Sequence, residues 1–379
     1  MNRPGERFVN LSATATVLSP EPSSVVAFDR AGRLITFAQG ESFFRRSLGS
    51  DLFERHRTAE TRWRKLGEPE AAKRFAEARE LALAMASEPG EVALRERVER
   101  EVAPWTPERL LAERERFDRT YRPIAILPPD QYLSVVVQAT EGCTWNRCTF
   151  CSFYQDRPFR ARGMAELGAH LAAVRELLGG DLARRRSVFL ADGNALALGT
   201  RRLLPIFDRI ARELPGLPVA SFVDVWSGEK HDPADWHALV ARGLTQVAIG
   251  MESGDDELLA LVDKPGSVRE LASFVAELKA AGVALSLIVI AGLGGERFRV
   301  RHREATVAAL AALPLDRHDL VYLSPFVEDP TSEYARRAAA SGLQAMTPEA
   351  IADELATLAV ALRAAGLRVG RYDLREFFY

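Results

Sequence analysis

The chain has 379 residues, of which 47% are hydrophobic and 27% charged, and its formal net charge is −2 at pH 7. This composition is typical of globular proteins, and the length predicts a sizeable core and about two domains. The balanced charge provides no overall attraction to nucleic acid or membrane. No stretch approaches the roughly 20 apolar residues of a membrane span, and the N-terminal residues lack the apolar core of a secretory signal. We therefore expect a cytoplasmic protein.

The first 125 residues predict a hairpin followed by helices. Residues 25–28 and 33–37 flank a turn that contains Gly32, a pattern typical of a β-hairpin. From about residue 50 to residue 119 the chain is rich in Arg, Glu, Ala and Leu, which indicates amphipathic helices with charged outer faces. Because Arg is interleaved with Glu, a helical cap or dimerisation element is favoured, and a nucleic-acid-binding arm is the alternative.

A segment that contains Pro123, Pro128 and Pro129 marks a boundary, because proline disfavours helix at its own position and the one before it. After it, six short apolar runs alternate with helical patterns, which predicts βαβ units and a parallel sheet. The strand-like runs are Leu133–Gln138, Ser187–Ala191, Val219–Val225, Gln246–Met251, Ala284–Ile290 and Leu320–Leu323. The helical patterns lie near 164–179, 200–213, 233–242, 255–280 and 301–313.

The predicted fold is therefore α/β. A partial (β/α)6 barrel at residues 126–330 follows an N-terminal, mostly helical domain at 1–125. A C-terminal tail at 331–379 contains a helix from about Pro348 to Ala365.

Cys143, Cys148 and Cys151 are the three cysteines of the chain, and they lie in one short run. Iron–sulfur clusters are held by cysteine thiolates, normally four. Three ligands without a fourth predict a [4Fe–4S] cluster with one iron open to a substrate or cofactor, as the open position of a catalytic metal site is. The run follows the first predicted strand, at the edge where parallel α/β folds bind ligands. Reduced thiolates beside a metal fit a cytosolic compartment.

Other interpretations of the cysteines are less favoured. A plant-type ferredoxin shares the C-x4-C-x2-C start but requires a distant fourth cysteine. A closed zinc site would have to borrow a histidine, and His170 is the first one after the run. The alternative to an enzyme is a non-catalytic iron–sulfur or zinc binding or carrier protein.

The cysteine run resembles that of radical S-adenosylmethionine (SAM) enzymes, whose usual spacing is C-x3-C-x2-C with an aromatic residue before the last cysteine. Phe150 occupies this aromatic position, and one extra residue separates Cys143 from Cys148. The resemblance covers about residues 122–330 and implies a [4Fe–4S] cluster, SAM and an external one-electron reductant of the flavodoxin or ferredoxin type. It implies reductive cleavage of SAM to a 5′-deoxyadenosyl radical, which acts on a substrate that the sequence does not identify.

Four later strand ends are similar to SAM-binding motifs of this family. The resemblance implies that the second strand end binds the methionine amine and the fourth faces the amino acid or ribose. The fourth, with Glu-Ser-Gly, is similar to coproporphyrinogen oxidase-like and methylthiotransferase-like members. The fifth strand would lie against adenine, and the sixth would close the mouth of the site. The matching residues, in strand order, are Asp192, Gly193 and Asn194, then Glu252 and Ser253, then Ile290 and Gly292, then Ser324.

The cysteine count also limits the chemistry. Methyl-cysteine formation or a second cluster would require further cysteines, so we expect a single-cluster enzyme that uses the adenosyl radical directly. Aromatic residues around the run, Trp145, Phe153 and Tyr154, could shield the cluster or stack on adenine, or only pack the loop. Arg157, Arg160 and Arg162 could clamp a carboxylate or phosphate, or form surface ion pairs.

Overall fold

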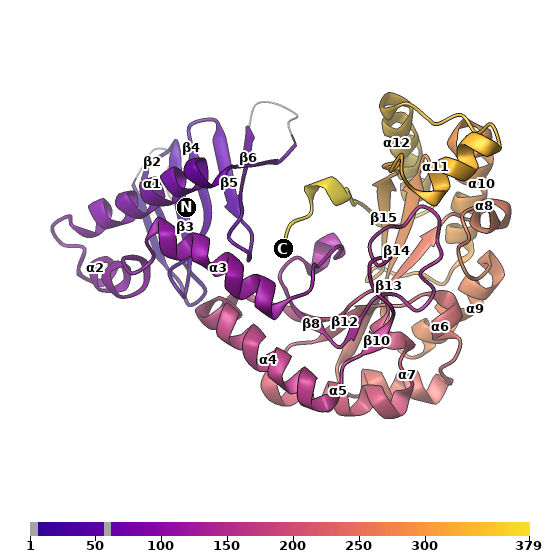
Figure 1. The fold of residues 1–379 in the computed structure, drawn as a ribbon, viewed down its shortest axis with the longest axis horizontal. Helices are drawn as coiled ribbons and strands as arrows, with labels where there is room; N and C mark the ends of the chain where they lie inside the picture. The colour runs from indigo at the N-terminus through magenta and orange to yellow at the C-terminus, as the bar shows by residue number, and fades with distance from the viewer. Residues whose placement is uncertain (1–6, 57–61) are drawn as a thin grey trace. The chain divides into compact units, whose positions relative to one another are not determined.

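The computed structural model describes residues 7–56 and 62–379. The chain forms two compact units that interleave along the sequence (Figure 1). Unit 1 comprises Met1–Ile124, Ala169–Arg185 and Arg375–Tyr379, and unit 2 comprises Ala125–Gly168 and Arg186–Leu374. The first division, after Ile124, lies beside the predicted boundary at residue 125. The sequence did not indicate that two later segments join the first unit.

Unit 1 contains a seven-stranded antiparallel sheet, so the prediction of a mostly helical N-terminal domain is wrong. The strands pair in sequence order, as a meander. They are β1 Phe8–Leu11, β2 Ala15–Glu21, β3 Ser24–Asp29, β4 Leu34–Gln39, β5 Ser42–Arg46, β6 Leu52–His56 and β7 Arg64–Lys65. The predicted hairpin is confirmed as β3–β4. Gly32 is required in its turn, since its φ is +88° and a Cβ there would lie 1.7 Å from the Glu101 carbonyl oxygen.

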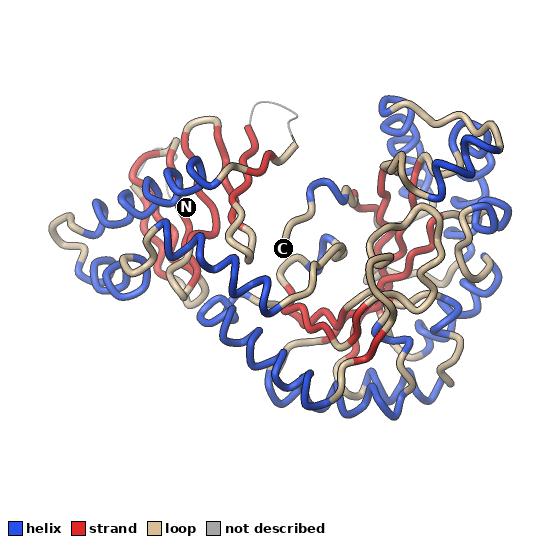
Figure 2. Tube along the Cα trace, in the orientation of Figure 1, coloured by secondary structure: helices blue, strands red, loops and turns tan. Residues whose placement is uncertain are grey.

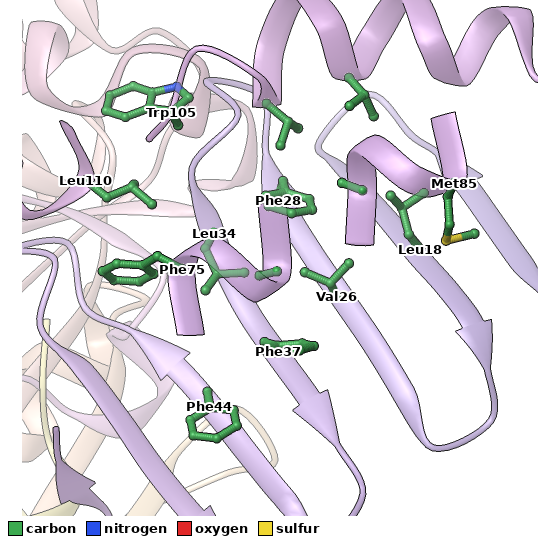
Figure 3. Close-up of a cluster of buried hydrophobic side chains, with 14 of the residues drawn as sticks. Leu18, Val26, Phe28, Leu34, Phe37, Phe44, Phe75, Met85, Trp105 and Leu110 are labelled. Atoms are coloured by element: carbon green, nitrogen blue, oxygen red, sulfur yellow. The ribbon is translucent and has the colours of Figure 1, made fainter. Parts of the chain in front are cut away.

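Three helices cover this sheet: α1 Glu68–Ala86, α2 Val92–Arg97 and α3 Pro107–Thr120. Apolar side chains from the strands pack against α1 and the segments that follow it, as Figure 3 shows for Phe28, Phe37 and Phe75. These three helices account for most of the stretch from about residue 50 to residue 119 in which the sequence predicted amphipathic helices.

Arg33 binds the end of α4 (Met164–Leu178), a later segment that belongs to unit 1. Its side chain is buried, and it pairs with Asp29 at 3.0 Å and with Glu113 at 3.0 Å. The same guanidinium donates to the carbonyl oxygens of Leu177 at 2.6 Å and Leu178 at 2.5 Å, at the end of α4. A buried charge is stable only when it is paired and hydrogen-bonded, so α4 completes the partners of Arg33.

Unit 2 is an α/β unit with a seven-stranded parallel sheet in the order β16-β15-β14-β13-β12-β11-β8, consistent with the predicted partial barrel. The six predicted strands are present, and β16 adds a seventh beside β15. The strands are β8 Ser134–Gln138, β11 Ser187–Ala191, β12 Val219–Phe222, β13 Leu244–Glu252, β14 Ala284–Ala291, β15 Leu320–Pro325 and β16 Val369–Arg371. Figure 2 shows helices along the outer side of the curved sheet.

The helices of unit 2 follow the predicted order with one break. They are α5 Thr200–Glu213, α6 Val225–Gly228, α7 Pro233–Val240, α8 Asp256–Leu261, α9 Val268–Ala280, α10 Gly295–Ala312, α11 Glu333–Ala340 and α12 Pro348–Ala364, whereas α4 begins in unit 2 and lies mostly in unit 1. The single helix expected over 255–280 is two helices, because Pro265 and Gly266 (φ +91°) interrupt it. Within the described residues, no helix is both long enough and apolar enough to cross a membrane.

The two edges of the parallel sheet differ in function. At the amino edge, Gln131 accepts from the hydroxyls of Ser134 at 2.7 Å and Ser187 at 2.9 Å, and it donates to Gln246 at 2.9 Å. These bonds join side chains of neighbouring strands into one internal network. The carboxyl edge carries the cysteine run and the other predicted site residues, as expected for ligand binding in parallel sheets.

Candidate functional site

The cysteine loop leaves β8 through a turn that only glycine fits. Gly142 has a φ of +78°, and a Cβ there would lie 2.9 Å from the Pro158 carbonyl oxygen. The loop is then anchored to the end of α8: the Thr149 N–H donates to the Val262 carbonyl at 3.0 Å, and the Trp145 indole N–H donates to the Asp263 carbonyl at 2.7 Å. These bonds fix the loop that carries the cysteines against the segment after β13.

The three cysteines are free thiols of intermediate burial. Burial raises the pKa of Cys148 to about 12 and of Cys151 to about 11. Two groups oppose this: the Phe153 backbone N–H donates to Cys151, and the charge of Lys264 lowers the pKa of Cys148. Thiols of this kind become thiolates when a bound metal supplies positive charge, and N–H bonds to sulfur are among the contacts that tune iron–sulfur clusters.

The chemistry of the donor set fits an iron–sulfur cluster, because all three candidate ligands are cysteines. In the described part of the chain, no group of three or more His, Cys, Asp or Glu side chains is arranged to hold one metal ion. A single zinc ion binds sulfur at about 2.3 Å, which brings its ligands almost into contact. A four-iron cluster separates its ligands more widely, and thiolates are the usual ligands of such clusters.

Glu252 and Lys264 form a buried ion pair beside this loop. Glu252 ends β13 at a bulge, with a φ of +59°, and its Oε1 accepts from Lys264 Nζ at 2.7 Å. The side chains are only 9% and 12% exposed. Burial lowers the pKa of Lys264, but the charge of Glu252 and the hydrogen bond raise it further, so the ammonium stays charged. The charge of Lys264 lowers the pKa of Cys148 and the charge of Glu252 raises it, so the pair lies next to the cysteine loop.

Gly250 makes room for this pair. A Cβ at Gly250 would lie 2.1 Å from Glu252 Oε1 and 2.9 Å from Lys264 Nζ. The positive φ at Glu252 therefore turns its carboxylate back over the glycine of its own strand. Sequence reasoning identified Glu252 and missed Lys264, because the contact depends on the break between α8 and α9.

Asp192 follows β11, and one of its carboxylate oxygens has no hydrogen-bond partner. Its carboxylate accepts from the Tyr154 hydroxyl and the Gly142 N–H, whereas Oδ2 has no hydrogen-bond partner. Burial raises the pKa of Asp192 to about 6, and Arg157, 3.8 Å away, opposes the shift. Gly193 is required here, since a Cβ would lie 2.6 Å from the Tyr154 ring. Asp192 and Gly193 thus lie against the cysteine loop.

Asn194 also has a buried oxygen without a partner. Its amide N–H groups are shared among Thr144 at 2.8 Å, Ser227 at 3.0 Å and the Asp224 carboxylate. Asp224 caps α6 by accepting from the Ser227 N–H at 2.7 Å. The Oδ1 atom of Asn194 is buried and has no hydrogen-bond partner. Sequence reasoning missed Asp224 and Ser227, although an aspartate before a short helix is a recognisable cap.

Ser253 is placed differently from the cofactor-facing role that the resemblance implied. It has 0% exposure, its hydroxyl lies 2.7 Å from His302 Nδ1, and it accepts from the Asp255 N–H at 3.0 Å. Its hydroxyl therefore already has two partners within the protein. His302 was not identified from the sequence.

The remaining predicted residues form an apolar wall. Phe150, Ile290 and Phe326 pack against one hydrophobic cluster with Leu258 and Leu293. Ile290 of β14 is paired with Ser324 of β15, and Ser324 is buried. Gly292, with a φ of +93°, follows β14. The structure therefore brings the cysteine loop and the ends of the fifth and sixth predicted strands together.

The three arginines after the cysteines have different surroundings. Arg160 pairs with Glu141 at 2.8 Å and Glu166 at 2.9 Å, and Arg162 approaches Glu141 at 3.4 Å. Arg157 lies over the Tyr154 ring, and its Nε has no hydrogen-bond partner. Surface ion pairing therefore accounts for Arg160, whereas Arg157 belongs to the surroundings of Asp192.

The family model described as the Radical SAM superfamily matches residues 137–303. Residues 137–303 therefore form a radical SAM domain. The match begins at the end of β8 and includes the cysteine loop, the Asp192 turn and the Glu252–Lys264 pair. Membership implies a [4Fe–4S] cluster, SAM and a source of electrons, as the sequence predicted. No curated protein matches the sequence.

Solved structures of radical SAM proteins are similar at low identity. Coproporphyrinogen III oxidase from Escherichia coli has 14% identity and a TM-score of 0.47, and the likeness covers 62% of this chain and 52% of the oxidase. The methyltransferase TsrM from Kitasatospora setae has 17% identity and a TM-score of 0.43 over 59% of this chain and 41% of its own. The likeness thus spans about half of the first structure and less of the second. These values are too low to assign a substrate.

Proposed function

We propose that this radical SAM enzyme binds one [4Fe–4S] cluster through Cys143, Cys148 and Cys151 and cleaves SAM reductively there. The observation that carries the proposal is the set of charged and unpartnered groups around the cysteine loop. The Glu252–Lys264 pair acts on Cys148, and Asp192 is hydrogen-bonded to the loop through Gly142. When bound, the cluster would supply one electron for the reductive cleavage of SAM, and the 5′-deoxyadenosyl radical so formed would act on the substrate.

The charged ends of SAM match the groups that the site leaves available. Asp192 Oδ2 and Asn194 Oδ1 are buried acceptors without partners. Buried polar groups are nearly always hydrogen-bonded, so an ammonium group would supply the missing donors. The Lys264 ammonium would attract the carboxylate of the same ligand. The remaining acceptor capacity of Glu252 suits ribose hydroxyls.

The apolar part of SAM would lie on the other side of the loop. We assign Phe150, Ile290 and Gly292 to the wall beside the adenine ring, with Ser324 at its edge. Ser253 contributes by fixing the turn after Glu252, since its hydroxyl is occupied by His302 and Asp255. Tyr154 and the aromatic residues of the loop exclude water, which protects a reactive intermediate from side reactions.

The electron comes from an external one-electron carrier of the flavodoxin or ferredoxin type. The described residues contain three cysteines, all of which this proposal uses as cluster ligands. An internal relay of further iron–sulfur clusters would require additional thiolates.

Anaerobic reconstitution tests the proposal. About four irons per chain are expected, together with 5′-deoxyadenosine that forms only when SAM and dithionite are both present. Serine variants of Cys143, Cys148 and Cys151 should lose both properties, whereas alanine at the exposed Ser152 in the same loop should keep them. A fully loaded cluster that never cleaves SAM would overturn the proposal in favour of a carrier protein.

A further inference from the structure

Two indole rings and two cations cluster where the cysteine loop meets α6. The Trp145 and Trp226 rings are 5.6 Å apart at 62°. The guanidinium of Arg147 lies 5.0 Å from the Trp145 ring centre, and Lys230 Nζ lies 3.4 Å from the Trp226 ring centre. We call these four residues the tryptophan–cation patch. Both contacts have the geometry of cation–π interactions.

Trp226 is exposed, Trp145 is half-buried, and both cations are exposed. Trp226 is 40% exposed, and the side chain of Arg147 is 66% exposed. Tryptophan and arginine are enriched in protein–protein interfaces and dominate their binding energy. An exposed tryptophan between cations is therefore a candidate anchor for a partner protein.

Hydrogen bonds fix the two segments that carry Trp145 and Trp226. The Trp145 N–H is fixed to the Asp263 carbonyl, and Trp226 lies in the first turn of α6, which Asp224 caps. The Thr144 and Ser227 hydroxyls, 3.3 Å apart, connect the two segments. A surface ordered before binding loses less conformational entropy when a partner docks.

The two cations of the patch, Arg147 and Lys230, are both exposed. Arg147 lies 3.6 Å from the Asp263 carboxylate, which is 28% exposed and neutralises part of its charge. Glu229, which precedes Lys230, is also exposed and adds a negative charge beside it. Lys230 is exposed, and the ring of Trp226 is its closest described partner. An acidic surface would complement this arrangement.

We propose that the tryptophan–cation patch is the docking surface for an acidic one-electron carrier protein, an inference that rests on the proposed function. Trp145 and Arg147 lie between two cluster ligands, Cys143 and Cys148, so a protein docked on them is next to the metal centre. One electron leaves the reduced carrier, which is oxidised by one electron, and enters the metal centre, which is reduced by one. The extra residue between Cys143 and Cys148 lengthens the segment that presents this surface.

Binding is measured first, with oxidised flavodoxin as the acidic probe and isothermal titration calorimetry as the readout. We expect Lys230→Glu and Arg147→Glu to weaken binding about ten-fold each, since charge complementarity changes association by at least that factor. Trp226→Gln should weaken it without changing the salt dependence. Arg201→Glu, an exposed charge reversal on α5, is the matched control and should bind as the wild type does. Flavodoxin that does not bind the wild type at low salt, or binds all four variants equally, overturns the proposal.

Activity provides the second readout. With flavodoxin, flavodoxin reductase and NADPH as the electron source, 5′-deoxyadenosine formation should fall about ten-fold in Lys230→Glu and Trp226→Gln, in line with the weaker association. With dithionite, the same variants should match the wild type. A parallel loss with both reductants would show that the patch supports the site rather than the carrier and would overturn the proposal. A wild type that is inactive with dithionite would instead contradict the proposed function, and the calorimetric result would still decide whether the carrier docks on the patch.

Discussion

Lys264 Nζ donates to Glu252 Oε1 at 2.7 Å, and both atoms lie over Gly250, the residue two positions before Glu252. The two side chains come from opposite ends of one segment, β13 and the turn after α8. Buried ion pairs contribute little net stability, because the cost of removing both charges from water is large. This pair also shifts the pKa of Cys148. We therefore attribute the pair to ligand binding rather than to stabilisation of the fold.

Alanine at Gly250 should displace this pair. The new Cβ would meet the Glu252 carboxylate and the Lys264 ammonium at distances shorter than contact. We expect iron content near the wild-type level and at least a ten-fold loss of SAM affinity, about 1.4 kcal/mol or more. Equilibrium binding of SAM to the reconstituted protein checks this. Gly199→Ala, where a Cβ meets nothing within 4 Å, is the control, and an equal loss in both variants would contradict the assignment.

Removing one member of the pair should cost more than removing both. Lys264→Met leaves the buried Glu252 carboxylate unpaired, so we expect a loss of about 3–5 kcal/mol in the free energy of unfolding. The double variant Glu252→Gln with Lys264→Met should recover most of this stability. Urea unfolding of the wild type, Lys264→Met, Glu252→Gln and the double variant measures the coupling. SAM binding should stay lost in the double variant, and its recovery together with stability would rule out a ligand role for the pair.

Asp192→Asn should stabilise the folded protein at neutral pH and weaken SAM binding. The folded-state pKa of Asp192 is raised to about 6 by burial, above its ordinary value, so the charged form is disfavoured in the fold. Stability is therefore fully present at low pH and is lost as pH rises through about 6. At pH 7.5 the asparagine variant should gain up to about 3 kcal/mol, and this gain should disappear near pH 4.

Urea unfolding of the metal-free protein at both pH values measures the change. SAM affinity, determined on the reconstituted protein, should fall because an amide attracts an ammonium group less strongly than a carboxylate does. An Asp192→Asn protein that is no more stable at pH 7.5 than at pH 4, relative to wild type, would contradict the shift.

His302 predicts the opposite pH dependence. Burial lowers the pKa of His302 to about 4, although the Asp255 charge opposes this. As pH falls below the ordinary histidine value of about 6.5, the unfolded chain gains a proton that the folded protein does not bind until about pH 4, so stability decreases over this range. The decrease amounts to about 3 kcal/mol. His302→Asn should remove this part of the pH dependence, measured by urea unfolding from pH 4 to 7, whereas asparagine at the exposed His237 should leave it unchanged.

The sequence predicted the parallel sheet well because its strands are buried on both faces and appear as apolar runs. β8 Ser134–Gln138 and β11 Ser187–Ala191 lie almost where expected. β16 Val369–Arg371 was missed because three residues with a central glycine give no periodic signal. The antiparallel sheet of unit 1 was missed for another reason. Strands such as β5, Ser42–Arg46, combine adjacent aromatic and adjacent charged residues, so they lack the alternation of apolar and polar residues that predicts a strand.

The candidate site was predictable where local sequence carries the chemistry. The cysteines are adjacent in the chain, and Asp192 and Glu252 follow strands directly. Lys264 and His302 were not predictable, because they reach their partners through a turn and through a helix packed from elsewhere, whereas Asp224 was missed although its capping position is recognisable. Tertiary contacts of this kind have no fixed spacing along the chain.

The bonds from Arg33 to Leu177 and Leu178 have a consequence for synthesis of the protein. On the ribosome, Arg33 emerges well before its two carbonyl acceptors, and Asp29 is the first of its described ion-pair partners to be made. The first unit therefore cannot complete its buried polar contacts until the early barrel segments have been translated. A gene fragment that ends at the first boundary would encode a sheet that lacks these acceptors, so folding of the nascent chain proceeds by late closure rather than domain by domain.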